Sequence, residues 1–410
     1  MVNACLLLTV LSIAASALGA AGSSAANVAA TGPAATNVAA MRSPATRPLG
    51  STEKAPATQR GVIVATEGRP AHFPHRIWAA TDYEARPADF GWFGDAETRN
   101  IPAYPGNRTA RKGTGPVDGV AALKTGMNPV PGPRMGKVNK IYVRYYLEGT
   151  DTVIFQYFSL TSSDNCNIRA TGLRQGVWAE SVLDFTHDSR RNDGSPGAFQ
   201  DGERMDDLQV YAGTPGDGRK YTLIIDDPIL FAEDPALPPE PEPFPRRVMF
   251  LAAFDTGIDA RSLPKYYPGQ LEIVTDKAPP GSYWGVAKAV PAADGSVSHV
   301  VLQMKPPRPS GPNTKIRFRY WIKGADMLAV RVHDATADRQ VGPAMIGCPQ
   351  GQWRTQYFSL SRSERTDKGE PMPAGSLLDV VSFDCPLGGE LYIDEVVLFD
   401  SQQEATTDKH

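Results

Sequence analysis

Arginine and aromatic side chains stand at alternate positions in KIRFRYWIKG, the stretch that begins at Lys315. In a β-strand, successive side chains point to opposite faces. One face of this stretch is then apolar, and the other carries Arg319 and Trp321. An aromatic ring can stack on the apolar face of a sugar, while arginine donates hydrogen bonds to hydroxyls or to an acidic group. The stretch therefore predicts a strand with one face in a core and one face open to a ligand.

The next stretch, LAVRVHD, repeats the alternation and directs Arg331 and His333 outward. If the turn at 324–326 makes a hairpin, both residues join Arg319 and Trp321 on one face. We expect these four side chains to form a sugar-binding surface, and the two arginines favour an anionic sugar such as a uronate or a sulfated residue. The simpler alternative is that they only pair across strands or cover apolar surface with their stems.

The sequence contains two related halves, because several blocks recur in the same order. KIYVRYYLEGTD precedes QGVW and LIIDDPILF in the first half, and KIRFRYWIKGAD precedes QGQW and LYIDEVVLF in the second. Two periods of this length indicate a tandem of two diverged domains. In the first copy, the outward positions are occupied by Arg144, Tyr146 and Gln156, which form the weaker of the two predicted carbohydrate-binding faces.

Composition favours an all-β fold. The chain has 36 prolines and 38 glycines among 410 residues, which indicates short strands and many turns. Its 42 basic and 45 acidic residues leave a net charge of −3, which argues against a nucleic-acid binder that relies on bulk electrostatics. No nucleic-acid partner is expected.

Boundaries follow from shifts in composition. An apolar run near the N-terminus, followed by small residues, is typical of a signal peptide and predicts a secreted, periplasmic or extracellular protein. No later stretch has the apolar length to span a membrane. The predicted segments are a signal peptide at 1–21, a low-complexity leader at 22–60, a β-sandwich domain at 61–234, a proline-rich linker at 235–247, a second β-sandwich at 248–400 and a polar tail at 401–410.

The succession RFRYWIKGAD, LAVRVHD, GQWRTQYFSL and LYIDEVVLF resembles the jelly-roll carbohydrate-binding modules of the galactose-binding-like type. The resemblance covers most of the second half and, more weakly, the first. It implies two tandem antiparallel β-sandwiches that bind a polysaccharide or oligosaccharide without catalysis. It also implies that Trp178 and Trp353 are mostly structural and pack beside the cores.

The same resemblance implies a structural calcium ion in each domain, between an acid of the first strand and an acid of the last. The residues concerned are Asp255 with Asp394 in the second domain, and Asp82 with Asp226 in the first. Carboxylate and carbonyl oxygens suit calcium. Aspartates at strand ends also form turns, so a purely structural role is the alternative.

Removal of the signal peptide leaves three cysteines, Cys166, Cys348 and Cys385. In an oxidising compartment, Cys348 and Cys385 are candidates for a disulfide because they lie in the same half. The alternative is that all three are small buried hydrophobic residues.

Two other functions stay open. Jelly-roll polysaccharide lyases abstract a proton beside a uronate carboxylate with a Tyr or His base, and RVH at 331–333 faintly resembles one of their strands. The alternative of a structural surface or adhesion protein would use the two sandwiches for protein contacts. No hydrolase, phosphate-loop or zinc-protease motif occurs, so we expect no catalytic residue.

Overall fold

The computed structural model describes residues 62–83, 95–98, 110–113, 120–126, 134–191, 193–197, 201–213, 217–255, 267–361 and 372–401. These residues all belong to one compact unit, Thr58–His410. The predicted signal peptide, the leader and nearly all of the tail lie outside the described residues. Within the described ranges, no helix is long and apolar enough to cross a bilayer.

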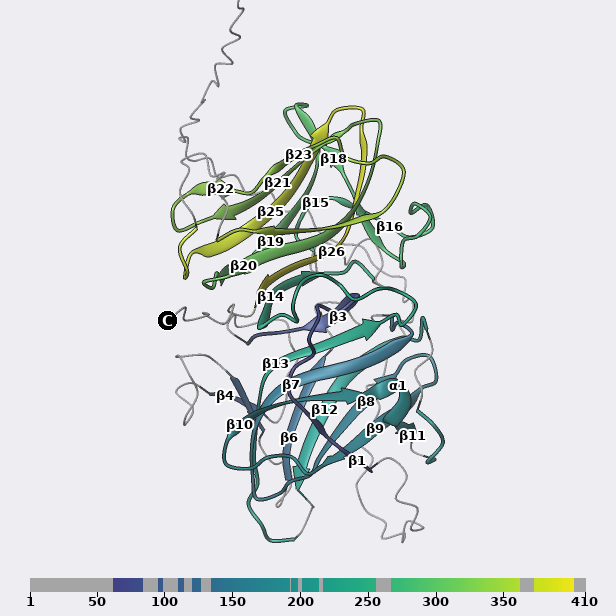
Figure 1. Ribbon diagram of the computed structural model, residues 1–410, viewed down its shortest axis with the longest axis vertical. Helices are drawn as coiled ribbons and strands as arrows, with labels where there is room; N and C mark the ends of the chain where they lie inside the picture. The colour runs from purple at the N-terminus through teal and green to yellow at the C-terminus, as the bar shows by residue number, and fades with distance from the viewer. Residues whose placement is uncertain are drawn as a thin grey trace, which may run out of the picture. The chain divides into compact units, whose positions relative to one another are not determined.

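The first half of the chain builds two sheets from short strands (Figure 1). Their strands, with the helix α1, are β1 (Val62–Val64), β2 (Thr66–Glu67), β3 (Arg76–Ala80), β4 (Asp95–Thr98), β5 (Ala110–Gly113), β6 (Val120–Gly126), β7 (Val138–Glu148), β8 (Val153–Ser159), β9 (Asp164–Thr171), β10 (Trp178–Asp184), α1 (Phe185–Asp188), β11 (Arg190–Arg191), β12 (Met205–Gly213) and β13 (Thr222–Glu233). One sheet has the order β1-β9-β8-β12-β6, with β11 beside β9. The other has the order β2-β10-β7-β13-β5-β4, with β3 beside β13.

The second half builds two more sheets. Their strands are β14 (Arg247–Ala252), β15 (Gly269–Gln270), β16 (Glu272–Val274), β17 (Val286–Lys288), β18 (Val290–Pro291), β19 (Val297–Pro309), β20 (Thr314–Lys323), β21 (Met327–Asp334), β22 (Arg339–Val341), β23 (Ala344–Ile346), β24 (Arg354–Ser359), β25 (Leu377–Pro386) and β26 (Glu390–Asp400). One sheet has the order β16-β17-β26-β20-β24, with β14 beside β26. The other has the order β15-β19-β25-β21-β22, with β18 beside β19 and β23 beside β21.

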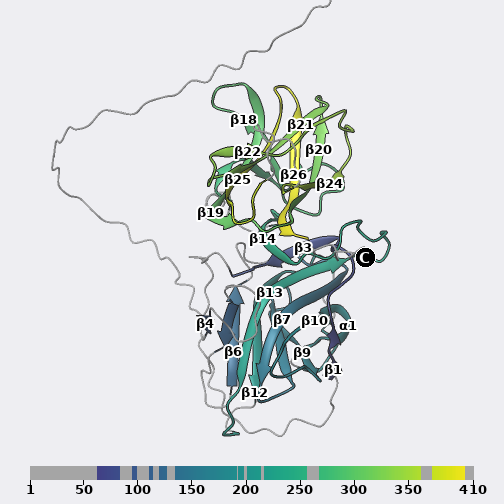
Figure 2. The same cartoon turned by 60° about the vertical axis from the view of Figure 1, so that its left-hand side comes forward.

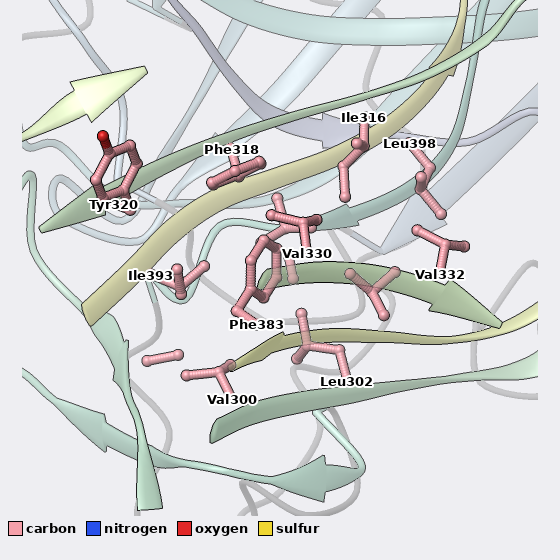
Figure 3. Packing of buried hydrophobic residues seen from close by; sticks show 14 of the residues in the cluster. Val300, Leu302, Ile316, Phe318, Tyr320, Val330, Val332, Phe383, Ile393 and Leu398 are labelled. Atoms are coloured by element: carbon pink, nitrogen blue, oxygen red, sulfur yellow. The ribbon is translucent and has the colours of Figure 1, made fainter. Parts of the chain in front are cut away.

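The all-β expectation is confirmed, and each half has its own hydrophobic core. Among the described strands, every pairing is antiparallel except β1 with β9, which is parallel. Figure 3 shows the second core, in which Phe318 of β20 meets Val330 of β21 and Phe383 of β25. The residues of β20 that were expected to face inward are fully buried, as are those of β7. The alternation of apolar residues thus identified both core faces correctly.

A third apolar cluster joins the two halves. It contains Phe73 and Tyr142 from the first half, and Val397 and Phe399 from the last strand. Phe244 of the predicted linker is fully buried in the same cluster. At this junction β3 contacts β14, as both ribbon views show (Figures 1 and 2). The proline-rich segment is therefore packed against both halves instead of acting as a free spacer.

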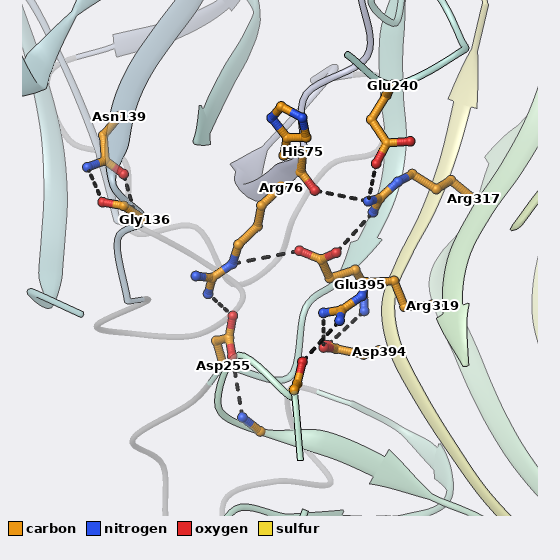
Figure 4. Close-up of polar contacts among 12 residues, drawn as sticks. His75, Arg76, Gly136, Asn139, Glu240, Asp255, Arg317, Arg319, Asp394 and Glu395 are labelled. Atoms are coloured by element: carbon orange, nitrogen blue, oxygen red, sulfur yellow. Dashed lines mark hydrogen bonds and ion pairs between the residues drawn. The ribbon is translucent and has the colours of Figure 1, made fainter. Parts of the chain in front are cut away.

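Arg317 lies at the centre of this junction. It stands on the same face of β20 as Arg319 and Trp321, and the alternation along the strand directs this face away from the core. Its guanidinium is 3.1 Å from Glu395 and donates to the backbone oxygen of His75 at 2.9 Å (Figure 4). Glu240 of the linker lies 3.6 Å away. The side chain points away from its own core, as expected, but the first half and the linker bury it to 1% exposure. Only long-range packing decides this.

We predict that Arg317→Met destabilises the protein by about 3 kcal/mol, because it leaves the buried Glu395 with only a longer contact to Arg76. The measurement is the free energy of urea unfolding. Lys315→Met is the matched control, because Lys315 lies in the same strand as Arg317 and forms a more exposed ion pair, with Glu242. We expect this substitution to lower the free energy of unfolding by less than about 1 kcal/mol. Equal losses in the two variants would contradict a structural role for Arg317.

Candidate functional site

The four residues predicted to share one surface lie in two different sheets. Arg319 and Trp321 belong to β20, which pairs with β24 and β26. Arg331 and His333 belong to β21, which pairs with β22, β23 and β25. The hairpin prediction is wrong, because the turn after β20 carries the chain across the core to the facing sheet. Outward side chains of two facing sheets point in opposite directions.

The first half shows the same separation. Arg144 and Tyr146 lie in β7, whereas Gln156 lies in β8 of the facing sheet. Gln156 donates to the side-chain oxygen of Gln209 at 3.2 Å. The expected grouping of these three residues is therefore wrong as well, because only Arg144 and Tyr146 share a sheet face.

An aromatic row crosses the outer face of the β20 sheet. Trp321 pairs in register with Tyr392 of β26, and their ring centroids are 5.5 Å apart at an interplanar angle of 77°. On the other side, Tyr320 pairs with Arg354, which places Trp353 next in line beside Trp321. Both tryptophans are partly exposed.

The β7 sheet carries the same row in the first half. Tyr146 pairs with Ile224 on one side and with Trp178 on the other, and the rings of Tyr146 and Trp178 are 6.0 Å apart. These three residues form a cluster separate from the core. Trp178, like Trp353, thus lies on the outer face of its sheet. The family resemblance had implied that both tryptophans pack beside the cores, and this expectation is wrong. Sequence reasoning missed both as candidate site residues, although each lies two residues after a Gln-Gly pair, with Trp178 as the first residue of β10 and Trp353 just before β24.

The arginines form a second row on the same faces. Arg144 and Arg319 each lie two residues before the aromatic residue of their strand, Tyr146 and Trp321. Arg144 lies 3.1 Å from Asp227 and 3.6 Å from Glu180, its partner across the strands. Arg319 lies 3.3 Å from Asp394, again its partner across the strands. Each arginine is thus held in place by carboxylates of neighbouring strands.

In the second half, a loop covers part of this row. Tyr283, which precedes β17, lies under the guanidinium of Arg319 with 4.4 Å to the ring centroid, and Trp353 lies 5.0 Å away. Arg319 also donates to the backbone oxygen of Gly281 at 3.1 Å. The negative charge of Glu395, followed by burial, raises the pKa of Tyr283 to about 12. The phenol, 43% exposed, therefore stays a hydrogen-bond donor.

The first half has a cavity on the corresponding face. Its volume is about 500 Å³, large enough for a few sugar rings. The wall combines one large aromatic ring with two arginines and two glutamates. The lining residues are Glu67, Gly68, Arg144, Arg174, Trp178, Ala179 and Glu180. Aromatic surface with polar groups beside it is the composition that a sugar site needs.

The other outward residues of the second half are engaged by acids. Arg331 lies 3.3 Å from Asp384. His333 contacts Asp379 through Nδ1 at 2.7 Å and Asp338 through Nε2 at 3.2 Å. Both ring nitrogens of His333 thus contact carboxylates.

The aspartates predicted to bind calcium in the second half are engaged by protein donors. Asp255 pairs with Arg76 through Oδ2 and accepts the Gly285 amide at Oδ1. Asp394 pairs with Arg319 through Oδ2 and accepts the next backbone amide at Oδ1 (Figure 4). Burial, followed by the charge of Glu395, raises the pKa of Asp394. Both carboxylates are thus paired with a guanidinium and a backbone amide in this structure.

The pair predicted for the first half is arranged similarly. Asp82 lies 3.9 Å from Arg247, and Asp226 accepts the amide of Asp227 at 2.9 Å. Across the described ranges, no group of three or more His, Cys, Asp or Glu side chains could hold a metal ion. Calcium stays a prediction from the family resemblance.

The three cysteines within the described residues, Cys166, Cys348 and Cys385, are buried free thiols. The disulfide considered between Cys348 and Cys385 does not form. Burial is the main factor that raises the pKa of Cys385 to about 11, so this thiol stays protonated and unreactive near neutral pH.

Comparisons with known proteins give no family assignment: no family model matches the chain, and no curated protein does. Several solved structures align with it. The tandem CBM22 domains of Xyn10C from Paenibacillus barcinonensis align over 82% of this chain and 100% of theirs, at 12% identity and a TM-score of 0.26. The family 11 carbohydrate-binding module of Lic26A-Cel5E from Clostridium thermocellum aligns over 41% and 98%, at 14% identity and 0.27. A Paenibacillus xanthan lyase aligns over 80% and 27%, at 12% identity and 0.24. Scores this low carry no weight for function.

We predict a pH-dependent contribution of His333 to stability. Burial lowers its pKa, but the hydrogen bonds to Asp379 and Asp338 outweigh burial, and the net pKa is raised above 6.5. The folded protein then binds this proton more tightly than the unfolded chain does. The extra stability is fully present below the unfolded pKa and is lost as pH rises through the folded pKa.

The measurement is the free energy of unfolding of wild type and His333→Gln at about pH 5 and about pH 8.5. We expect the loss caused by the substitution to be larger at the lower pH. In an Asp379→Asn background, this difference should shrink. A loss that is independent of pH would show that the two carboxylates do not hold the proton.

Proposed function

We propose that this chain is a non-catalytic carbohydrate-binding protein, and that its principal site is the cavity beside Trp178 in the first half. The observation that carries the proposal is the composition of this cavity. A partly exposed indole lies in one wall, next to charged groups whose positions are fixed by pairing. A sugar ring needs both features, an apolar platform and oriented polar groups.

The matching registers support a second site of the same kind. Tyr146 and Trp178 occupy the same row positions as Trp321 and Trp353. Asp227 and Glu395 share a left-handed backbone conformation, each with φ of 48°, next to the acid that pairs across from the arginine. We propose that the two halves are diverged copies of one module, with the row around Trp321 as the second site.

Binding without catalysis accounts for the polar groups better than a lyase does. A lyase base must accept a proton from the substrate, whereas both nitrogens of His333 contact carboxylates. In the cavity, both oxygens of Glu180 accept from Arg69, at 2.7 Å and 3.3 Å. These pairings suit fixed acceptors and donors for a bound sugar. We also propose that the protein is exported, on the strength of its N-terminal apolar run.

The experiment is affinity electrophoresis of the full chain on gels that contain neutral or acidic polysaccharides. We predict that wild type is retarded on at least one polymer and that Trp178→Ala weakens this binding by about tenfold or more, because the stacking platform is lost. Trp321→Ala tests the second site in the same way.

Leu237→Ala is the control, since this exposed leucine lies in the linker and outside both rows. Its mobility should equal that of wild type on every gel. The proposal fails if no polymer in a broad panel retards the protein, or if Trp178→Ala and Trp321→Ala together leave the retardation unchanged.

A further inference from the structure

Of the charged groups paired with one another beside Trp178, the acid Glu180 is the most exposed. Glu180 lies opposite Arg144 across the β10–β7 ladder and receives two hydrogen bonds from Arg69. The Glu180 side chain is 30% exposed, whereas Arg69 is 13% and Arg144 14% exposed. The carboxylate is therefore more accessible than the two cations that bind it.

The two arginines are also committed elsewhere. Arg144 lies 3.1 Å from Asp227, whose side chain is completely buried. Arg69 donates to the phenol oxygen of Tyr142 at 2.7 Å. An anionic ligand that approached either guanidinium would have to compete with a carboxylate already in place.

The remaining cation of the cavity is balanced more loosely. Arg174 and Glu67 are each 56% exposed and lie 4.0 Å apart. Such an exposed pair is worth little and leaves both side chains adaptable. The cavity lining thus contains two cations and two anions, and Glu180 is the rigidly held acid among them.

We propose that Glu180 determines the charge selectivity of this site: it accepts hydrogen bonds from the hydroxyls of an uncharged sugar and repels uronates and sulfated sugars. The inference rests on the proposed carbohydrate-binding function. The sequence suggested an anionic sugar from Arg319 and Arg331 of the second half. For the first-half site an uncharged sugar is proposed instead, because Arg69 and Arg144 are already paired with carboxylates. Carboxylates accept hydroxyl hydrogen bonds strongly, and like charges at close range disfavour binding.

The second half supplies an internal contrast. The residue opposite Arg319 on the neighbouring strand β24 is Thr355, where the first half has Glu180 opposite Arg144. The row around Trp321 therefore lacks this acid. Charge selectivity by Glu180 is specific to the first half, and Trp178 reports on that half alone.

The test uses the full chain in affinity gels that contain neutral polymers (β-glucan, galactan, xylan or mannan) or acidic polymers (polygalacturonate or a sulfated galactan). In a Trp321→Ala background, the first-half site is observed by itself. We expect a neutral polymer to retard this protein, and we expect the retardation not to change with salt concentration. Glu180→Gln should weaken that binding, and should strengthen binding to an acidic polymer by about tenfold or more at low salt.

Glu67→Gln is the matched control, because it removes the other acid of the cavity, which is exposed and loosely paired. It should change the ratio of acidic to neutral binding much less than Glu180→Gln. Glu180→Thr, which copies the second half, should act like Glu180→Gln. Urea unfolding of each variant verifies that it is folded.

Two outcomes overturn the inference while the carbohydrate-binding function stands. One is that the Trp321→Ala protein, which keeps Glu180, binds an acidic polymer more tightly than a neutral one through its Trp178 site. This comparison does not depend on whether a Glu180 variant folds. The other is that the Glu180→Gln substitution, in a folded Trp321→Ala protein, leaves the ratio of acidic-polymer binding to neutral-polymer binding unchanged. If no polymer of either class is bound, the proposed function fails and the inference fails with it.

Discussion

The buried pairing of Arg317 with Glu395 is the interaction on which the arrangement of the halves depends. Both side chains are at most 1% exposed, and a charge so far from water is stable only with a partner and hydrogen bonds. The partners come from three parts of the chain: the last strand, the backbone of His75 and the linker acid Glu240. The junction is therefore specified by polar groups inside an apolar cluster.

The same strand leads from this junction to the candidate binding face. Arg317, Arg319 and Trp321 all project from one side of β20. The first is covered by the other half, the second is held by Asp394 and partly covered by Tyr283, and the third is partly exposed. A single strand face thus passes from structural to candidate binding roles over a few residues, and what packs against each position decides its role.

Pairing with carboxylates changes what the arginines can do. An unpaired guanidinium on a sheet would attract anionic sugars. Here Arg144 and Arg319 each have a buried carboxylate as partner, so they act mainly as supports that fix the acids and aromatic rings around them. The aromatic rows and the exposed face of Glu180 then become the features that a ligand meets.

Sequence alone determined the core faces of β7 and β20, the all-β class and the recurrence of Arg with an aromatic residue beside each core. These features are local, because a period of two in one strand reports which side of that strand is apolar. It does not report which sheet the strand joins. That is why Arg331 and His333 were wrongly grouped with Arg319 and Trp321.

Only the tertiary structure decided what covers an outward side chain and which acid pairs with each arginine. Three features depend on contacts between residues far apart in the sequence: the burial of Arg317, the outer position of Trp178 and the pairing of Arg69 with Glu180. Such contacts depend on how whole sheets pack and on the need to satisfy every buried charge. A pattern within one strand cannot specify them.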